Sequence, residues 1–98
     1  MNKYTAGYHP DHWVVIKIPS TGLYKVLAGW DDSSWRINSG INLVVDHDDE
    51  VHFYGYSGSL YVCNKDKFGV TPATHSVYDQ VKHLVKLMDA DTNWNNLL

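Results

Sequence analysis

Short runs of β-branched and aromatic residues, separated at regular intervals by turn-forming residues, fill most of the chain. Residues 13–18 read Trp-Val-Val-Ile-Lys-Ile, and residues 23–28 follow after the turn sequence Pro-Ser-Thr-Gly. Because β-branched residues fit a pleated surface and proline and glycine favour tight turns, these two runs predict a hairpin. Similar runs follow at 34–37, 41–46, 51–56 and 59–63. The pattern predicts an antiparallel meander of about five to six short strands, and it leaves open whether the sheet curls into a small barrel.

A helical pattern follows the last of these runs. Thr71 is suited to cap a helix whose first position is Pro72. Apolar residues then recur at helical spacing and define one stripe: Ala73, Val77, Val81, Leu84, Val85 and Met88. The sequence therefore predicts one C-terminal amphipathic helix that ends near Asp89 and packs its stripe on the sheet. The expected fold class is α+β.

The length of 98 residues indicates a single domain over residues 1–98. Residues 1–11 are polar, contain Gly7 and Pro10, and predict an extended N-terminal arm. Residues 92–98 predict a C-terminal docking tail, which packs on the domain or on another chain. Its three large apolar residues are the candidates for self-association as a homodimer: Trp94, Leu97 and Leu98.

Charge and cysteine content argue against several partners and compartments. The chain has a net charge of −3 and no basic run, and this balance argues against nucleic acid as the partner. The single cysteine, Cys63, excludes an internal disulfide and is typical of a reducing compartment. No apolar run approaches the ~20 residues that span a bilayer, and the N-terminus lacks the apolar segment of a signal peptide. We therefore expect a soluble cytoplasmic protein without a membrane partner.

Motifs for catalysis, cofactors or metals are absent from the sequence. The six histidines are scattered and have one cysteine beside them, so they lack the spacing of a zinc site. Asp46, Asp48 and Glu50 alternate as in a calcium loop, but the glycine that such a loop requires is missing. Cys63 would need a base and an orienting group to act as a nucleophile, and no motif surrounds it. We expect no catalytic residue, no cofactor and no metal, although the pattern leaves open whether the histidines or the acidic turn bind one.

Aromatic side chains with polar tips are over-represented. The chain has 7 Tyr and 4 Trp but only 2 Phe. Tyrosine, tryptophan and arginine are enriched at interface hot spots because they bury a large area and keep a polar group. One sheet face is expected under the helix, and it carries Val26, Leu43, Val45, Val51 and Phe53. The other face and the Trp30–Trp35 loop are expected to be uncovered and to hold the partner-binding residues: Tyr24, Trp30, Asp31, Asp32, Trp35, Arg36, Tyr54 and Tyr56.

Two stretches carry a resemblance to a known group of proteins. Residues 24–30 and 34–40 resemble small uncharacterised accessory proteins of tailed bacteriophages, and residues 53–63 share this resemblance. This resemblance implies a context in which the protein acts in the host cytoplasm by binding and blocking a host protein. Some such proteins inhibit CRISPR or other defence systems. The resemblance supplies no functional residue for this chain.

Three functions stay open at this stage. The favoured one is a small protein-binding module that inhibits a host protein or protein complex by occlusion through its aromatic surface. The second is a self-associating structural module. The third is a small barrel that binds single-stranded nucleic acid or a nucleotide, because aromatic platforms suit base stacking. The charge argues against it, since such surfaces also carry a basic groove and this chain has a net charge of −3.

Overall fold

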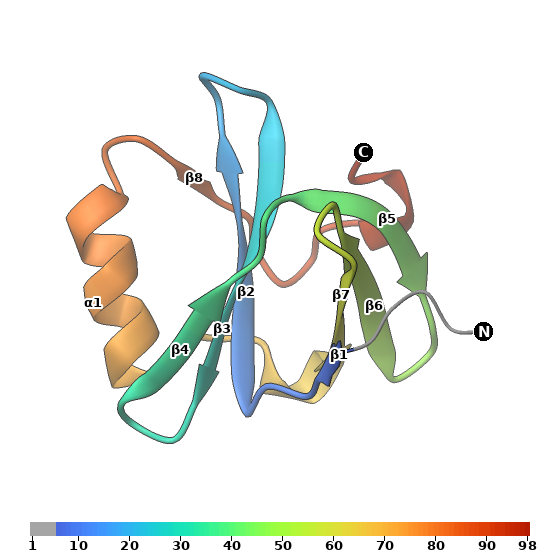
Figure 1. The fold of residues 1–98 in the computed structure, drawn as a ribbon, viewed down its shortest axis with the longest axis horizontal. Helices are drawn as coiled ribbons and strands as arrows, with labels where there is room; N and C mark the ends of the chain where they lie inside the picture. The colour runs from blue at the N-terminus through green and yellow to red at the C-terminus, as the bar shows by residue number, and fades with distance from the viewer. Residues whose placement is uncertain (1–5) are drawn as a thin grey trace.

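Two four-stranded sheets pack against each other in the computed structural model, which describes residues 6–98 (Figure 1). The mixed sheet has the strand order β1 (Ala6–Tyr8), β7 (Ser59–Asn64), β6 (Glu50–Gly55) and β5 (Ile41–Asp46). The antiparallel sheet has the order β4 (Ser34–Ile37), β3 (Leu23–Trp30), β2 (His12–Ile18) and β8 (Lys86–Leu87). The remaining elements are the helix α1 (Pro72–Val81) and the short 3₁₀ helices η1 (Lys65–Lys67) and η2 (Trp94–Asn96). The α+β class is confirmed.

The predicted hairpin is confirmed, but the strands divide between two sheets and form no closed barrel within residues 6–98. β2 and β3 pair antiparallel from His12 opposite Gly29 to Ile18 opposite Leu23. The chain leaves the antiparallel sheet after β4 because Gly40, with a φ of 141°, redirects it into β5. Asn38 fixes this crossing, since its side-chain oxygen accepts the backbone N–H of Val26 at 2.9 Å. The small-barrel scaffold of the nucleic-acid hypothesis is therefore not formed.

The start of the predicted N-terminal arm differs from expectation. Residues 6–8 form β1, which pairs parallel with β7 from Ala6 opposite Ser59 to Tyr8 opposite Tyr61. Residues 1–5 of the predicted arm lie outside the described residues. The sequence gives little sign of β1 because three residues are too short to show the alternation of a strand. β1 places Tyr8 next to strands that are distant in sequence.

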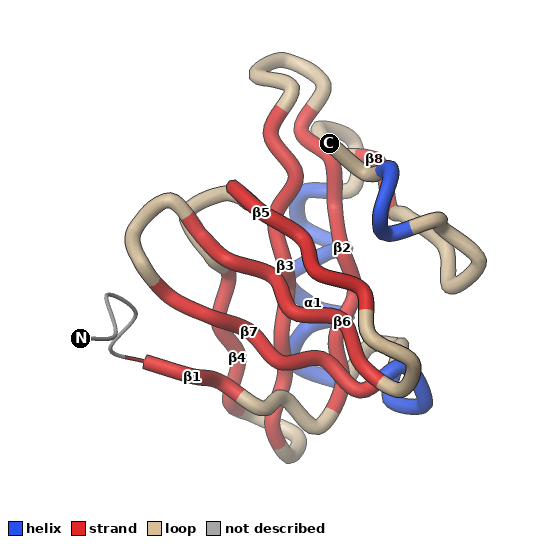
Figure 2. The backbone as a smooth tube through the Cα atoms, turned by 90° about the vertical axis from the view of Figure 1, so that its right-hand side faces the viewer, coloured by secondary structure: helices blue, strands red, loops and turns tan. Residues whose placement is uncertain are grey.

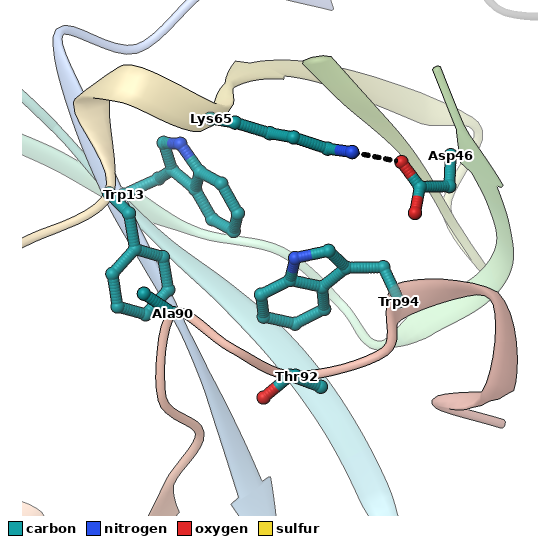
Figure 3. Close-up of a pocket in the computed structure, with 7 residues that line it drawn as sticks. Trp13, Asp46, Lys65, Ala90, Thr92 and Trp94 are labelled. Atoms are coloured by element: carbon teal, nitrogen blue, oxygen red, sulfur yellow. Dashed lines mark ion pairs between the residues drawn. The ribbon is translucent and has the colours of Figure 1, made fainter. Parts of the chain in front are cut away.

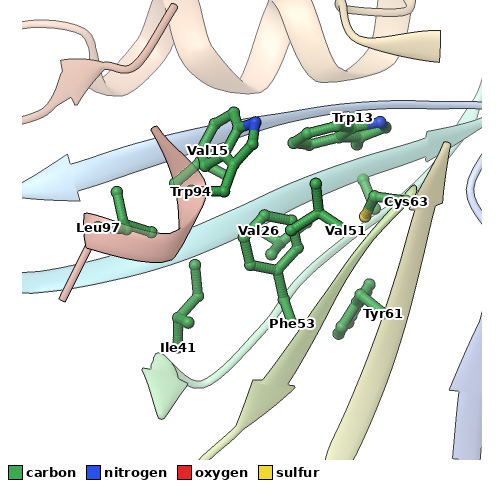
Figure 4. Packing of buried hydrophobic residues seen from close by; sticks show 11 residues of the cluster. Trp13, Val15, Val26, Ile41, Val51, Phe53, Tyr61, Cys63, Trp94 and Leu97 are labelled. Carbon is green, nitrogen blue, oxygen red and sulfur yellow. The ribbon is translucent and has the colours of Figure 1, made fainter. Parts of the chain in front are cut away.

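The core lies between the two sheets rather than under the helix (Figure 4). Alternate residues of β2 and β3, such as Val15 and Val26, face the mixed sheet and contact Val51 and Phe53 there. The prediction that Val26, Val51 and Phe53 face the helix is therefore wrong. The opposite faces of β2 and β3 are also buried, at Val14, Ile16 and Leu27, and α1 covers this side (Figure 1). The two central strands are thus covered on both faces, as their nearly continuous apolar sequence requires.

A bulge in β5 reverses part of the predicted inward pattern. Leu43 and Val45 were expected to point inward together with Ile41. The register shifts between Ile41 and Leu43, and from there on Val44 contacts the core while Leu43 is exposed. An extra residue in one strand of a pair changes which side chains face inward. The prediction for Leu43 and Val45 is therefore wrong.

The helix is shorter than the apolar stripe predicts. Thr71 does cap it, in a box in which Thr71 and Thr74 each accept the other's backbone N–H, at 3.2 and 2.8 Å. However, α1 ends at Val81, and Leu84 is exposed. The chain then forms β8, which pairs with β2, and Met88 donates its backbone N–H to Val15 at 2.9 Å. If the helix continued, the backbone groups on this edge of β2 would have no partner strand. β8 supplies that partner and satisfies them.

The C-terminal tail docks on its own domain. Trp94 is only 4% exposed and its ring lies 5.4 Å from that of Trp13 and 5.6 Å from that of Phe53. Leu97 is also buried, whereas Leu98 is 63% exposed. Of the three predicted self-association residues, only Leu98 is therefore exposed. Within residues 6–98, no helix is long and apolar enough to cross a membrane.

Candidate functional site

Rings from three strands meet where β3 ends. Trp30, the last residue of β3, lies edge-on to Tyr8 of β1, with ring centroids 6.1 Å apart, and its Nε1 donates to the His9 carbonyl at 3.0 Å. Tyr8 also packs on the buried ring of Tyr61 from β7, at a centroid distance of 4.9 Å. Arg36 of β4 completes the cluster with its guanidinium carbon 4.6 Å from the centre of the Tyr8 ring. This cation–π contact holds a cation and a ring together at the surface.

The contact between Arg36 and Tyr61 sets the charge of this cluster. The Arg36 guanidinium donates to the Tyr61 hydroxyl, and this bond is the main reason that the pKa of Arg36 lies above its usual value. Burial is the main cause that raises the pKa of Tyr61, because a phenolate is poorly solvated there. Near neutral pH the cluster therefore combines the permanent cation of Arg36 with the neutral phenol of Tyr61.

Asp31 holds the turn between β3 and β4 in place. Its carboxylate accepts the backbone N–H of Ser33 at 2.9 Å and of Ser34 at 3.1 Å. These two bonds, the one to Ser33 first, lower the pKa of Asp31. Asp31 itself has a φ of 44°, a left-handed conformation that aspartate tolerates. Its N–H donates to the Asp11 carboxylate at 3.0 Å, so the turn is also tied to the segment after β1.

Two shallow hollows flank this turn. The aromatic hollow, of about 370 Å³, is lined by Tyr8, Trp30, Ser34, Trp35 and Arg36. The acidic hollow, of about 350 Å³, has a charged lining that consists of Asp11, Asp31, Asp32 and Lys67. We call the residues that line these two hollows the β3–β4 surface. It can bury rings, pair a cation with its carboxylates and donate from Arg36, which together are the properties of interface hot spots.

Trp35 is the accessible ring of the β3–β4 surface, with 45% of its surface exposed. The register pairs Trp35 with Gly29 and Ser34 with Trp30. Because side chains alternate along a strand, Trp35 and Trp30 belong to opposite faces of the antiparallel sheet. β4 is an edge strand, so both reach the aromatic hollow from either side of it. Replacing Trp35 would therefore remove an exposed ring and leave the buried core intact.

The structure brings five of the eight predicted partner-binding residues together and separates the other three. The five that share the β3–β4 surface are Trp30, Asp31, Asp32, Trp35 and Arg36. Tyr24 lies at the opposite end of β3, partly buried and with the Lys17 ammonium 5.4 Å from its ring. Tyr56 is 62% exposed and lies against Gly40, and Tyr54 pairs in register with Leu43 and Leu60.

Sequence reasoning missed Tyr8, Tyr61 and Asp11 as parts of this site. Tyr8 belongs to a strand too short to recognise, and its parallel pairing with β7 joins residues about fifty positions apart. Tyr61 alternates inward in β7, so it reads as a core residue. The excess of tyrosine over phenylalanine was the one available signal, and it carries no position.

The uncovered sheet face carries Tyr54, as predicted, but not Trp30 and Trp35. In Figure 2 the mixed sheet lies in front, and the antiparallel sheet and α1 lie behind it. No element of residues 6–98 lies over the outer face of the mixed sheet. Trp30 and Trp35 belong to the other sheet, which packs on its two sides against the mixed sheet and α1. They are accessible because they lie at the end and edge of that sheet.

The side chains that metal or nucleophile chemistry would use include one close pair of histidines and one buried cysteine. The His47 and His52 rings lie 4.2 Å apart, and His52 contacts the Glu50 carboxylate at 2.7 Å, which is the main cause of the lowered pKa of Glu50. Within residues 6–98, no group of three or more His, Cys, Asp or Glu side chains is placed to hold a metal ion. Cys63 is buried in the core, and burial raises the pKa of its thiol far above the usual value.

We expect the Cys63 thiol to react with an aromatic disulfide reagent only after unfolding. In the folded protein the thiol is buried and keeps its proton. The free energy of unfolding should also fall as pH rises past the ordinary thiol value of 9.0, because only the unfolded chain then releases this proton. Reaction rates with and without urea measure the first effect, and Cys63→Ala isolates the second. Equal rates in both states would contradict the assignment.

No family model matches the chain, and no curated protein or solved structure is significantly similar to it.

Proposed function

We propose that this chain is a small protein-binding module whose partner docks on the β3–β4 surface and is blocked by occlusion. The observation that carries the proposal is the convergence of Tyr8, Trp30 and Arg36 beside the exposed ring of Trp35. The contacts among Tyr8, Trp30 and Arg36, and the bonds that hold Asp31, fix these four residues before any partner arrives. Pre-organised aromatic anchors lose little conformational entropy on binding.

The two hollows favour a particular chemistry in the partner. The aromatic hollow suits an apolar or aromatic side chain that packs between Trp30 and Trp35. The acidic hollow suits a lysine or arginine, because three carboxylates, those of Asp11, Asp31 and Asp32, outnumber its single ammonium group. A partner surface with an apolar anchor next to a basic residue would match both hollows. The resemblance to phage accessory proteins suggests a host protein or protein complex of the cytoplasm, such as a component of a CRISPR defence system.

Trp35→Ala is expected to weaken partner binding by at least about 30-fold, the effect of removing an interface hot spot. Its matched control is Tyr56→Ala, which also removes an exposed ring but lies outside the β3–β4 surface. The experiment captures partners from bacterial lysate with the wild-type chain and both variants, and then measures the affinity of the purified pair. Equal weakening by both variants, or by neither, would contradict docking on the β3–β4 surface.

Self-association through β4 is a second candidate. Among the strands of residues 6–98, β4 pairs with β3 alone. All four residues of β4 are exposed, and two of them, Trp35 and Ile37, are large and apolar. Such an edge can pair with the same edge of a second copy. Light scattering would then give a dimer that Ile37→Lys converts to a monomer, because a charged side chain blocks edge pairing. A wild-type monomer at high concentration would exclude this candidate.

A further inference from the structure

Four strands form the edges of the two sheets, and β4 is the one whose edge is unprotected. β1 and β8 have only three and two residues. β5 has a bulge, and the C-terminal tail lies beside its end, where Asp46 pairs with Lys65 next to Trp94 (Figure 3). Short strands, bulges and covering segments are the usual ways in which proteins block an edge. β4 has four residues in regular register with β3, and it pairs with no other strand of residues 6–98.

The register of β4 shows which of its backbone groups face away from β3. Asn38, just after β4, donates its backbone N–H to the Val26 carbonyl at 3.1 Å. In an antiparallel pair, residues that bond across the ladder alternate with residues that do not. Arg36, two positions before Asn38, therefore directs its backbone groups toward β3. Trp35 and Ile37 direct theirs away, so this edge offers two N–H and two C=O groups to an extended chain.

The side chains along this edge favour apolar residues in an incoming strand. Trp35 pairs in register with Gly29, and a Cβ atom on Gly29 would meet Thr71 at the start of α1. Trp35 and Ile37 therefore lie on the α1 side of the sheet, and both are exposed. Residues directly opposite each other on two strands project from the same face and contact each other. Apolar residues opposite Trp35 and Ile37 would cover both side chains.

The charges favour a chain of different sequence over a second copy. Arg36 lies between Trp35 and Ile37 and is a permanent cation, so an acidic residue suits the position opposite it. In an antiparallel strand the next positions lead to the turn that carries Asp31, where a basic residue fits. The register in which two copies use all their outward groups pairs Trp35 with Ile37. That register places Arg36 opposite Arg36, which is unfavourable.

We propose that the partner of the β3–β4 surface adds an extended segment to β4 as a further antiparallel strand. This inference rests on the proposed function and names the form that the partner takes there. The segment carries apolar residues opposite Trp35 and Ile37, with an acidic residue between them opposite Arg36. A basic residue follows next to the Asp31 turn. Backbone hydrogen bonds supply the affinity, and the alternating side chains supply the selectivity.

The test is an NMR titration of the ¹⁵N-labelled protein with the peptide acetyl-Val-Glu-Val-Thr-Lys-amide, whose first valine lies opposite Ile37. In the matched control peptide, an N-methyl group on the second valine removes the N–H that donates to the Trp35 carbonyl. We expect a Kd of about 1 mM and downfield shifts of the Trp35 and Ile37 backbone amides, because both gain an acceptor. The methylated peptide should give no saturable shift. No saturable shift with the first peptide, or equal binding of both peptides, would overturn the proposal.

Two substitutions at Ile37 separate the backbone from the side chain. Ile37→Ala removes the apolar side chain and keeps the N–H, and we expect it to weaken peptide binding by less than about tenfold. Ile37→Pro removes the outward N–H and leaves the ladder to β3 in place, so it should abolish saturable binding. Equal binding by the two variants would contradict pairing through the backbone. The two peptides on the wild-type chain decide the question even if Ile37→Pro does not fold.

Failure of this inference differs measurably from failure of the proposed function. A captured partner that Trp35→Ala weakens, together with a peptide that does not bind, keeps the docking surface and overturns strand addition. A captured partner that ignores Trp35→Ala overturns the docking surface, whatever the peptide does. If the Trp35 and Ile37 amides shift with protein concentration alone, a second copy occupies the edge, and the assignment to a partner chain is wrong.

Discussion

Trp94→Ala is expected to lower the free energy of unfolding by about 3–5 kcal/mol, the usual loss for truncating a buried aromatic residue. Trp94 contacts Trp13, Phe53 and Phe68, at ring-centroid distances of 5.4, 5.6 and 6.2 Å. These rings belong to β2, to β6 and to the segment after η1, so the substitution opens a cavity where both sheets meet the tail. Urea unfolding followed by circular dichroism measures the change, because total fluorescence would also change with the loss of an indole.

Leu98, in the same C-terminal tail, offers a control for the Trp94→Ala substitution. Leu98→Ala removes an apolar side chain that is 63% exposed, and we expect it to change the free energy of unfolding by no more than about 0.5 kcal/mol. If the C-terminal residues were loosely attached, Trp94→Ala would be nearly as mild as Leu98→Ala. A loss below about 1 kcal/mol for Trp94→Ala would therefore contradict the docked tail.

Gly29→Ala is expected to destabilise the protein by about 1–3 kcal/mol through overpacking. A Cβ atom on Gly29 would lie 2.7 Å from Thr71 Oγ1, 2.8 Å from Thr71 Cγ2 and 3.0 Å from Thr74 Cγ2. Those two threonines form the capping box of α1, so their displacement would disturb the start of the helix. The loss should appear in both the urea midpoint and the helical signal.

Gly7→Ala is the matched control for this substitution. Gly7 also lies in a strand, but a Cβ atom there would meet nothing within 4 Å. Without a clash, alanine reduces the freedom of the unfolded chain, so we expect no loss of stability. Similar losses in the two variants would show that Gly29 matters for strand formation in general and not for the contact with α1.

The two predictions rest on contacts that the sequence indicates to different degrees. Trp94 stands out as a large apolar residue in a polar tail, and docking on the domain was one of the two expected outcomes. The approach of α1 to Gly29 leaves no local sign, because Gly29 reads as part of a loop. The candidate site shows the same contrast: Trp30, Trp35 and Arg36 follow from composition and spacing, whereas Tyr8 reaches them only through β1.

The amino-acid sequence by itself determines the local elements of this protein. Alternation, turn residues and the Thr71-Pro72 start define six strands, the β2–β3 hairpin and the beginning of α1, because these depend on neighbours a few residues away. Only the tertiary structure decides how the strands divide into two sheets, where the bulge in β5 turns Leu43 outward and where α1 stops. Those outcomes depend on which distant strand pairs with the free backbone N–H and C=O groups of an edge strand. They also depend on which side chains fill the space between the sheets. The partner-binding surface depends on the same long-range pairing, since it forms where β1 brings Tyr8 to the end of β3.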